Sequence, residues 1–461
     1  MSEDLTSKSI SELAAKIRSR TITATELVEA HLKRIEQVNP RLNAIVTIAP
    51  DVLEQAQAAD KSLSEDGCPG PLHGVPLTIK DTIATKGLRT TYGSRIRDRH
   101  YPENDAHVVQ RLRAAGAIIL GKTNTPEMAI PYESDNPVFG RTNNPHDLNR
   151  TSGGSSGGEA AAIAAHLSPG GVGSDLSGSI RVPAHFCGIA GLKPTTGLIP
   201  MDGHVPEATG TLALGACIGP MARRVGDLTL LLRIMSGALP GTGAANQTNV
   251  ELRGVKAAYY YDDGVSPVTS ETLLAVEKAA NVLSEAGLQV RLERPPPVSH
   301  GSRLWVELFS QVAGDQIREF YRGREDQAGP LVASLLSHQL DKSTLEDRIE
   351  IAERTARAVV ERERLRESLL RWMKTTPLII APVGAVPAFV HGAYQVIVDG
   401  ELVRTFRAFS YSQTFNVFGL PALSVPVARS ADGLPIGVQI IGRPFEESRV
   451  LAAGAIIEGS L

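Results

Sequence analysis

The chain has 461 residues, of which 42% are hydrophobic and 21% charged, and its formal net charge is −3. This is the composition of a globular protein long enough to bury a large core, and the near-neutral charge argues against nucleic acid or an anionic membrane as a partner. No apolar run approaches the roughly 18 residues that a membrane-spanning helix needs, and Met1 to Ser9 lacks the basic-then-apolar pattern of a signal peptide.

The three cysteines, Cys68, Cys187 and Cys217, are far apart in the chain and odd in number. Such usage fits a reducing compartment better than a disulfide scaffold. We therefore expect a cytoplasmic protein with buried, unreactive thiols.

The N-terminal segment is predicted to be helical. Residues 11–20 have helical spacing of apolar positions, and Thr23-Ala-Thr-Glu26 is a capping-box pattern that opens a second helix to about residue 38. Pro40 is expected to end that helix, because proline lacks the backbone N–H that a helix interior uses.

Short apolar runs bounded by glycine then alternate with helix-like segments. Residues 75–79, 117–120 and 189–192 are predicted strands, and residues 106–114 form a predicted helix between two of them. Strands in alternation with helices indicate an α/β fold around a largely buried sheet. Residues 219–233 are interpreted as a return to a helix on that core.

The second half continues this pattern and then departs from it. Residues 238–250 look like a loop, and residues 302–374 are charged and helical, which predicts a peripheral helical lobe. We expect one domain over residues 1–461, with a core at 60–237 and 376–461 and an insertion at about 250–375. The remaining predictions are a strand–helix–strand unit at 255–261, 271–286 and 289–292, and buried strands at 378–382, 422–426 and 436–441.

Two segments match the spelling of known motifs, but the residues inside or before each motif do not fit the structure that the motif needs. Gly116-Ala-Ile-Ile-Leu-Gly-Lys-Thr123 spells a Walker A loop, but its inner residues form an apolar strand where a phosphate cradle is needed. Gly154-Ser-Ser-Gly-Gly158 spells a nucleophile elbow, but a polar segment precedes it in place of the required strand. The histidines show no paired metal-ligand spacing, so we expect structural or surface roles for them.

Lys80, Ser155 and Ser179 remain as chemically competent groups. Ser155 and Ser179 both lie in stretches of small residues, and around Ser179 successive backbone N–H groups can converge on an oxyanion. Lys80 closes an apolar run, so its burial would lower the pKa of the amine and allow it to act as a base. Alone, each feature is more often a strand-end lysine or a turn-rich loop.

Taken together, these stretches resemble the amidase signature family of serine hydrolases, over nearly the whole chain. The motifs that carry the resemblance are Gly74-Val-Pro-Leu-Thr-Ile-Lys-Asp81, Gly121-Lys-Thr-Asn-Thr-Pro-Glu127, Phe139-Gly-Arg-Thr-Asn-Asn-Pro145, Gly153-Gly-Ser-Ser-Gly-Gly158, Gly173-Ser-Asp-Leu-Ser-Gly-Ser-Ile-Arg-Val-Pro183, Phe186-Cys-Gly-Ile-Ala-Gly-Leu-Lys-Pro-Thr195, Phe415-Asn-Val-Phe-Gly-Leu-Pro-Ala-Leu423 and Gly433-Leu-Pro-Ile-Gly-Val-Gln-Ile-Ile-Gly442.

The resemblance implies an α/β/α sandwich with a large mixed sheet, and a Ser–Ser–Lys triad that cleaves an amide through an acyl-enzyme. The mechanism that it implies needs no metal and no organic cofactor. Ser179 matches the acylated nucleophile, Ser155 the bridging serine after a cis peptide bond from Gly154, and Lys80 the base.

It also implies residues that surround the reaction. Family members usually carry two glycines before the nucleophile, and Ser177 replaces one of them here; we expect its backbone not to need a positive φ. The implied neighbours are the oxyanion-loop residues Leu176, Ser177 and Gly178 with Ser179, the residues near the reacting carbonyl Ala129 and Ser156, and the loop supports Asp175 and Arg181.

The leading hypothesis is a stand-alone amidase acting on a small-molecule amide, with its pocket built from the helical lobe and residues 391–409. The alternative is the glutamine-hydrolysing component of a tRNA-dependent amidotransferase, which shares the signature; residues 374–407 look more like the amidases. A non-catalytic binding module is the least favoured, because all three triad residues are present. A homodimer is left open, and the identity of the amide is not predicted.

Overall fold

The computed structural model describes residues 4–64, 70–130, 132–237, 250–340 and 345–461. Most of the strands join in one eleven-stranded mixed sheet, in the order β1-β3-β2-β4-β6-β5-β12-β13-β9-β7-β8, and β10 and β11 form a separate hairpin. The strands are β1 Ile45–Ile48, β2 Pro76–Lys80, β3 Ile118–Thr123, β4 Gly170–Asp175, β5 Ala190–Lys193, β6 Cys217–Ala222, β7 Lys256–Tyr259, β8 Gln289–Leu292, β9 Leu378–Pro382, β10 Gln395–Val398, β11 Glu401–Arg404, β12 Ala422–Arg429 and β13 Pro435–Ile441.

Helices cover both faces of this sheet, which confirms the α/β/α sandwich that the resemblance implies. On one face α7 packs against β5 and β6, and α15 and α8 continue the layer over β12, β13 and β9; on the other, α5 and α6 lie over the central strands. The helices are α1 Ile10–Arg18, α2 Ala24–Leu42, α3 Val52–Ser64, α4 His107–Ala114, α5 Gly157–Ala164, α6 Arg181–Cys187, α7 Val225–Ser236, α8 Ser270–Glu285, α9 Gly301–Trp305, α10 Gln311–Tyr321, α11 Pro330–Leu340, α12 Leu345–Trp372, α13 Thr405–Ala408, α14 Ser410–Val417 and α15 Glu447–Gly459.

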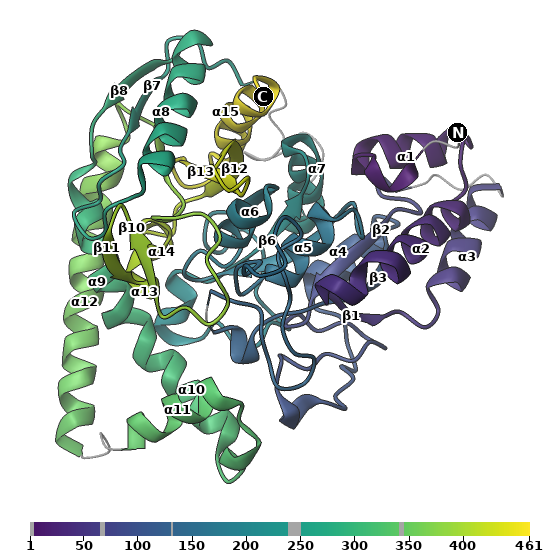
Figure 1. Cartoon of the computed structure of the whole chain (residues 1–461), viewed down its shortest axis with the longest axis horizontal. Coiled ribbons are helices and arrows are strands. Elements are labelled where there is room, and N and C mark those ends of the chain that lie inside the picture. Colours follow the sequence, from purple (N-terminus) through teal and green to yellow (C-terminus); the bar gives the residue numbers. More distant parts are fainter. Residues whose placement is uncertain (1–3, 65–69, 131, 238–249, 341–344) are drawn as a thin grey trace.

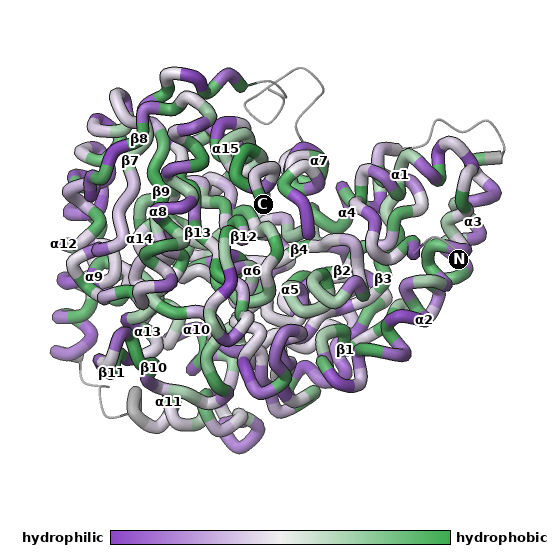
Figure 2. The backbone as a smooth tube through the Cα atoms, turned by 45° about the horizontal axis from the view of Figure 1, so that its top comes forward, coloured by the Kyte–Doolittle hydropathy of each residue, from purple (hydrophilic) through white to green (hydrophobic). Residues whose placement is uncertain are grey.

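The elements predicted as an insertion split into two parts. The strand–helix–strand unit extends the main sheet through β7 and β8, which pair in parallel with each other and, through β7, with β9. The helices α9 to α12 form the predicted peripheral lobe at the edge of the molecule, at the end away from α1 to α3 (Figure 1). Hydrophobic residues run along β12 and β13, whereas the outer helix α12 carries many hydrophilic ones (Figure 2).

The capping box of α2 is confirmed, since the Thr23 side chain accepts from the N–H of Glu26 and the Glu26 side chain accepts from the N–H of Thr23. The predicted end of that helix at Pro40 is wrong. The helix continues to Leu42 because a proline in the last turn loses only one intrahelical bond, and Asn43 then closes it in the left-handed conformation with φ of 52°.

The interpretation of residues 219–233 as a helix is wrong at its start. Residues Cys217–Ala222 form the buried strand β6 between β4 and β5, and α7 begins only at Val225. A short apolar run that contains glycine and proline carries no clear period, so its burial between two strands determines its conformation. The predicted loop at residues 238–250 lies outside the described residues except for Val250.

Candidate active site

Two parallel strands bring the candidate residues to one edge of the sheet. β2 pairs in parallel with β4, with Thr78 opposite Gly171 and Ile79 opposite Val172. Because parallel strands end at the same edge, Lys80 at the end of β2 lies beside Ser174 near the end of β4. The loop after β4 then carries Ser179 into α6, and Ser155 lies just before α5.

Lys80 is fully buried and its amine contacts two hydroxyls. Lys80 Nζ lies 2.6 Å from Ser155 Oγ and 2.9 Å from Ser174 Oγ. Burial lowers the pKa of Lys80 to about 7, although the negative charges of Asp175 and Glu159 oppose that shift. The amine is therefore able to exist in its neutral form near neutral pH. The peptide bond between Gly154 and Ser155 is cis.

Ser179 is held near this pair through its backbone. The N–H of Ser156 donates to the carbonyl of Ser179 at 3.1 Å, so the turn that carries Ser155 is bonded to the turn that carries Ser179. Ser179 is 7% exposed and Ser155 2% exposed. Among the described residues, the hydroxyl of Ser179 has no hydrogen-bond partner, in contrast to that of Ser155.

The residues Asp175 and Arg181 form a buried ion pair that holds the loop. Arg181 Nη2 lies 3.0 Å from Asp175 Oδ1, with both side chains fully buried. Burial alone would raise the pKa of Asp175, but the Arg181 guanidinium outweighs it and holds that pKa well below its usual range. Arg181 also donates to Gln439 and Asn416, at 2.8 and 2.6 Å, which ties the loop to β13 and α14.

The backbone N–H groups of this loop, which are the predicted oxyanion donors, differ in their hydrogen bonds. The N–H of Gly178 donates to Asp175 Oδ1 at 2.8 Å. Within the described part of the chain, the N–H groups of Leu176, Ser177 and Ser179 donate to no protein atom. Gly178 has a φ of 105°, whereas the φ of Ser177 is not positive. This confirms the expectation that the backbone of Ser177 does not need a positive φ.

Ser156 and Ala129, which are both predicted to lie near the reacting carbonyl, have different surroundings. Ser156 is fully buried, and its hydroxyl exchanges two 3.3 Å hydrogen bonds with the backbone of Ser174 in β4; its predicted place near the reacting carbonyl stays a prediction. Ala129 is half-buried in the loop after β3 with φ of 62°, and nearby Glu127 is bonded to Tyr321 and to the backbone of Gly329 in the helical lobe.

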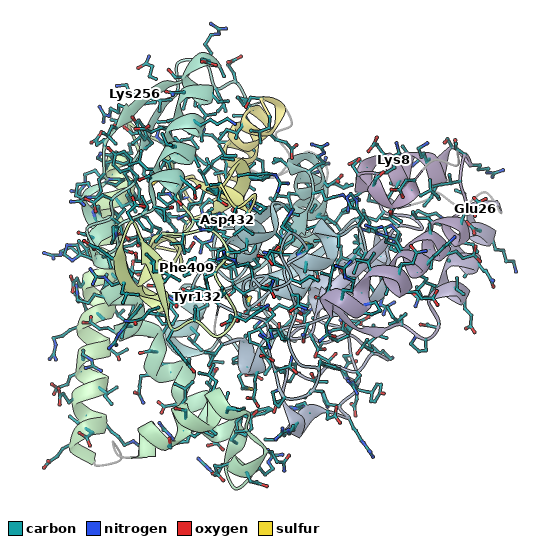
Figure 3. The ribbon with its side chains drawn as sticks, viewed as in Figure 1. Lys8, Glu26, Tyr132, Lys256, Phe409 and Asp432 are labelled. Atoms are coloured by element: carbon teal, nitrogen blue, oxygen red, sulfur yellow. The ribbon has the colours of Figure 1, made fainter. Side chains whose placement is uncertain are left out.

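Two aromatic side chains that the sequence analysis missed hold the carbonyls of the loop. Trp305 Nε1 donates to the carbonyl of Leu176 at 2.7 Å, and Tyr132 Oη donates to that of Ser177 at 2.9 Å. Tyr132 also packs on Phe409, with ring centroids 4.6 Å apart, and Figure 3 shows the two side by side. Neither residue belongs to the motifs that carry the resemblance, and no local pattern in the sequence marks either of them.

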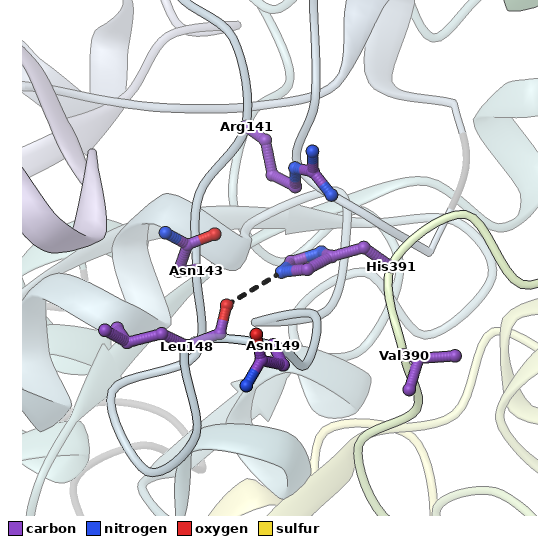
Figure 4. A pocket seen from close by; sticks show the side chains of 6 residues that line it. All are labelled: Arg141, Asn143, Leu148, Asn149, Val390 and His391. Carbon is purple, nitrogen blue, oxygen red and sulfur yellow. Dashed lines mark hydrogen bonds between the residues drawn. The ribbon is translucent and has the colours of Figure 1, made fainter.

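A polar cavity of about 610 Å³ lies elsewhere, between the 141–149 loop and His391 (Figure 4). Arg141, Asn143 and Asn149 line it, and His391 Nε2 lies 3.3 Å from the carbonyl of Leu148. None of Lys80, Ser155 and Ser179 lines this cavity. In the described ranges no group of histidine, cysteine and carboxylate side chains could hold a metal ion, and no helix is long and apolar enough to cross a membrane.

Comparison with known proteins agrees with the fold and with the site motifs. The Amidase family model matches residues 26–451. The chain is 32% identical to a component of the glutamyl-tRNA(Gln) amidotransferase of Bdellovibrio bacteriovorus, covering 99% of this chain and 98% of that protein. It is also 32% identical to human fatty-acid amide hydrolase 2, covering 97% and 88%. The solved structure of 6-aminohexanoate cyclic dimer hydrolase with substrate superposes with a TM-score of 0.85 at 30% identity, covering 100% and 98%.

A family match of this length shows an enzyme of the amide-hydrolysing class. The chain belongs to the Amidase family, the amidase signature family indicated by its motifs.

Proposed function

We propose that the protein hydrolyses a carboxylic amide through an acyl-enzyme on Ser179, with Ser155 and neutral Lys80 as the proton relay. The observation that carries this proposal is a fully buried lysine whose Nζ lies 2.6 Å from Ser155 Oγ, on a segment bonded to the backbone of Ser179. A lysine in that setting has a lowered pKa and acts as a base without histidine.

The steps balance with these three side chains and water. Ser179 Oγ attacks the amide carbonyl, its proton passes to Ser155, and the Ser155 proton passes to Lys80. As the C–N bond breaks, the relay returns a proton to the leaving nitrogen, which departs as ammonia or an amine. Water then attacks the acyl-enzyme by the same relay, and carboxylate and free Ser179 result.

The negative charge on the carbonyl oxygen needs fixed donors. We assign this role to the N–H groups of Leu176, Ser177 and Ser179, because that of Gly178 is bonded to Asp175. Asp175 and Arg181 support the loop and take no part in bond making.

Trp305 is expected to orient one of these donors. The peptide bond between Leu176 and Ser177 is trans, so its N–H points opposite to the carbonyl that Trp305 Nε1 holds at 2.7 Å. Replacing Trp305 by phenylalanine keeps an aromatic ring and removes the donor, and we expect kcat to fall about tenfold with KM little changed.

The matched control is Trp372→Phe. Trp372 ends α12 in the same lobe, and its Nε1 donates to Glu293 Oε1 at 3.0 Å, away from the loop. Steady-state kinetics on both variants should separate them; an equal loss of kcat in the two would assign the effect to stability of the lobe.

The second candidate function is glutamine hydrolysis within a tRNA-dependent amidotransferase, which the names of several relatives favour. Purified protein is to be assayed with a panel of aliphatic, aryl and amino-acid amides and p-nitroanilides, and with glutamine. Release of amine or ammonia from the panel without partner chains supports the stand-alone amidase. Turnover of glutamine alone, or only after an amidotransferase partner is added, would replace it by the second candidate.

We further propose one domain over residues 1–461, since strands before and after the helical lobe share one sheet. A cytoplasmic location is supported by Cys187 and Cys217, which are free and buried.

A further inference from the structure

His204 lies behind the candidate base and contacts it through one hydroxyl. His204 Nε2 is 2.8 Å from Ser174 Oγ and 3.2 Å from Thr82 Oγ1, and Ser174 Oγ is in turn 2.9 Å from Lys80 Nζ. The histidine is 7% exposed, and its segment bridges to Ile83, just after β2. A buried chain of hydrogen bonds therefore runs from the imidazole to the lysine.

The partner of the other ring nitrogen identifies the tautomer. His204 Nδ1 lies 2.9 Å from the carbonyl oxygen of Pro206, and a carbonyl oxygen can only accept, so Nδ1 carries a proton. Burial, and next the charge of Lys80, lower the pKa of His204 to about 4, so the ring is neutral near pH 7. Nε2 then has a lone pair and accepts from the hydroxyl of Ser174, its nearer neighbour.

The tautomer of His204 determines which group donates in the hydrogen bond between Ser174 and Lys80. A hydroxyl has one proton, so a Ser174 that donates to His204 can only accept from Lys80. A neutral Lys80 has two N–H groups and one lone pair. One N–H faces Ser174, and the lone pair remains for Ser155 Oγ at 2.6 Å.

We propose that His204 is a positioning residue that, through Ser174, turns the lone pair of Lys80 toward Ser155. The inference rests on the proposed role of Lys80 as the base. Without His204, the hydroxyl of Ser174 is able to donate to Lys80 and competes with Ser155 for the lone pair. The sequence predicts structural or surface roles for the histidines, and His204 is an exception that becomes visible only through its contacts.

The tautomer is tested on the wild-type protein by nitrogen-15 NMR of labelled histidine side chains. The signals of His204 are assigned by their loss in His204→Gln. We expect a neutral ring with a protonated Nδ1 and an unprotonated Nε2. A protonated Nε2 would overturn the proposal, whether or not any substrate is known.

Steady-state kinetics test whether His204 acts on Lys80 through Ser174. We expect His204→Phe and Ser174→Ala each to lower kcat about 10- to 100-fold with KM changed less than about twofold. Because both changes remove the same chain, the double variant should fall no more than about twofold below the worse single variant. Losses that multiply in the double variant contradict the proposal.

His31→Phe is the matched control. His31 is fully buried, its Nδ1 likewise lies 3.2 Å from a carbonyl, that of Leu167, and its Nε2 has no partner among the described residues. This variant should keep the wild-type kcat. If the wild type hydrolyses no amide, the proposed function fails. If it does and His204→Phe keeps kcat within about twofold, only the role of His204 fails. If His204→Phe does not fold, the tautomer alone decides.

Discussion

Ser179→Ala is expected to lower kcat by at least about 10⁴-fold, the largest effect of any single substitution in this chain. Without Oγ no acyl-enzyme forms, and Ser155, which contacts Lys80, stays 2% exposed and is not placed to replace it. The loop backbone should survive, because Gly178 and Arg181 are bonded to Asp175 and not to the hydroxyl of Ser179.

Mass spectrometry separates this role from a structural one. After reaction with a fluorophosphonate or an activated ester, wild-type protein should carry one adduct on Ser179, and Ser179→Ala none. Ser152→Ala is the control, because Ser152 is a buried serine near the site whose hydroxyl has no partner in the described chain; it should label like wild type. An adduct on Ser155, or more than about one per cent of wild-type activity in Ser179→Ala, would reject Ser179 as the nucleophile.

The motifs predicted what local sequence determines. Lys80 ends β2 and Ser155 lies just before α5; the predicted burial of Lys80 is observed, with β2 inside the sheet between β3 and β4 and α5 packed against it. Apolar runs alternating with helical segments predicted an α/β fold around a buried sheet, whereas its mixed strand directions came from the family resemblance. β6 was not, because its glycine and proline hide the strand pattern until β4 and β5 flank it.

The site residues that the sequence did not predict were missed for a different reason. Trp305, Tyr132 and His204 reach the site across long separations in the chain, 129 positions in the case of Trp305 and Leu176. Their role depends on which carbonyl or hydroxyl they meet in the fold, and no spacing rule expresses that. The hydrogen bond from the Gly178 N–H to Asp175 was missed for the same reason, since the two groups meet only after the loop turns back.

Lys80→Met is expected to lower kcat about 10²- to 10⁴-fold, the range of general-base catalysis, while making the protein more stable. Methionine has a similar length and no charge to bury. In wild type, kcat/KM should rise with pH up to about 7, where Lys80 becomes neutral, and then level off. The variant should lose that acid limb together with the activity.

The sign of the stability change follows from proton binding. The pKa of Lys80 falls from 10.5 in the unfolded chain to about 7 in the fold, so between these values the unfolded chain binds more protons and wild-type stability rises with pH. Methionine removes the cost of burying the charge, which is greatest at and below pH 7 and disappears toward pH 10.5. One pKa unit corresponds to about 1.4 kcal/mol, so the free energy of unfolding of Lys80→Met should exceed that of wild type by more than about 1 kcal/mol at pH 7.

Urea unfolding of both proteins at pH 7 and pH 10 measures this difference. The gain should shrink at pH 10, and Lys86→Met, on a surface-exposed lysine six positions away, should show neither the gain nor the loss of activity. A Lys80→Met variant that is inactive and also less stable at pH 7 would mean that Lys80 is a charged structural residue whose hydrogen bonds to Ser155 and Ser174 outweigh its burial. A base that burial keeps neutral requires that Lys80→Met lowers kcat and raises the free energy of unfolding. The same desolvation that destabilises the fold keeps the amine able to accept a proton.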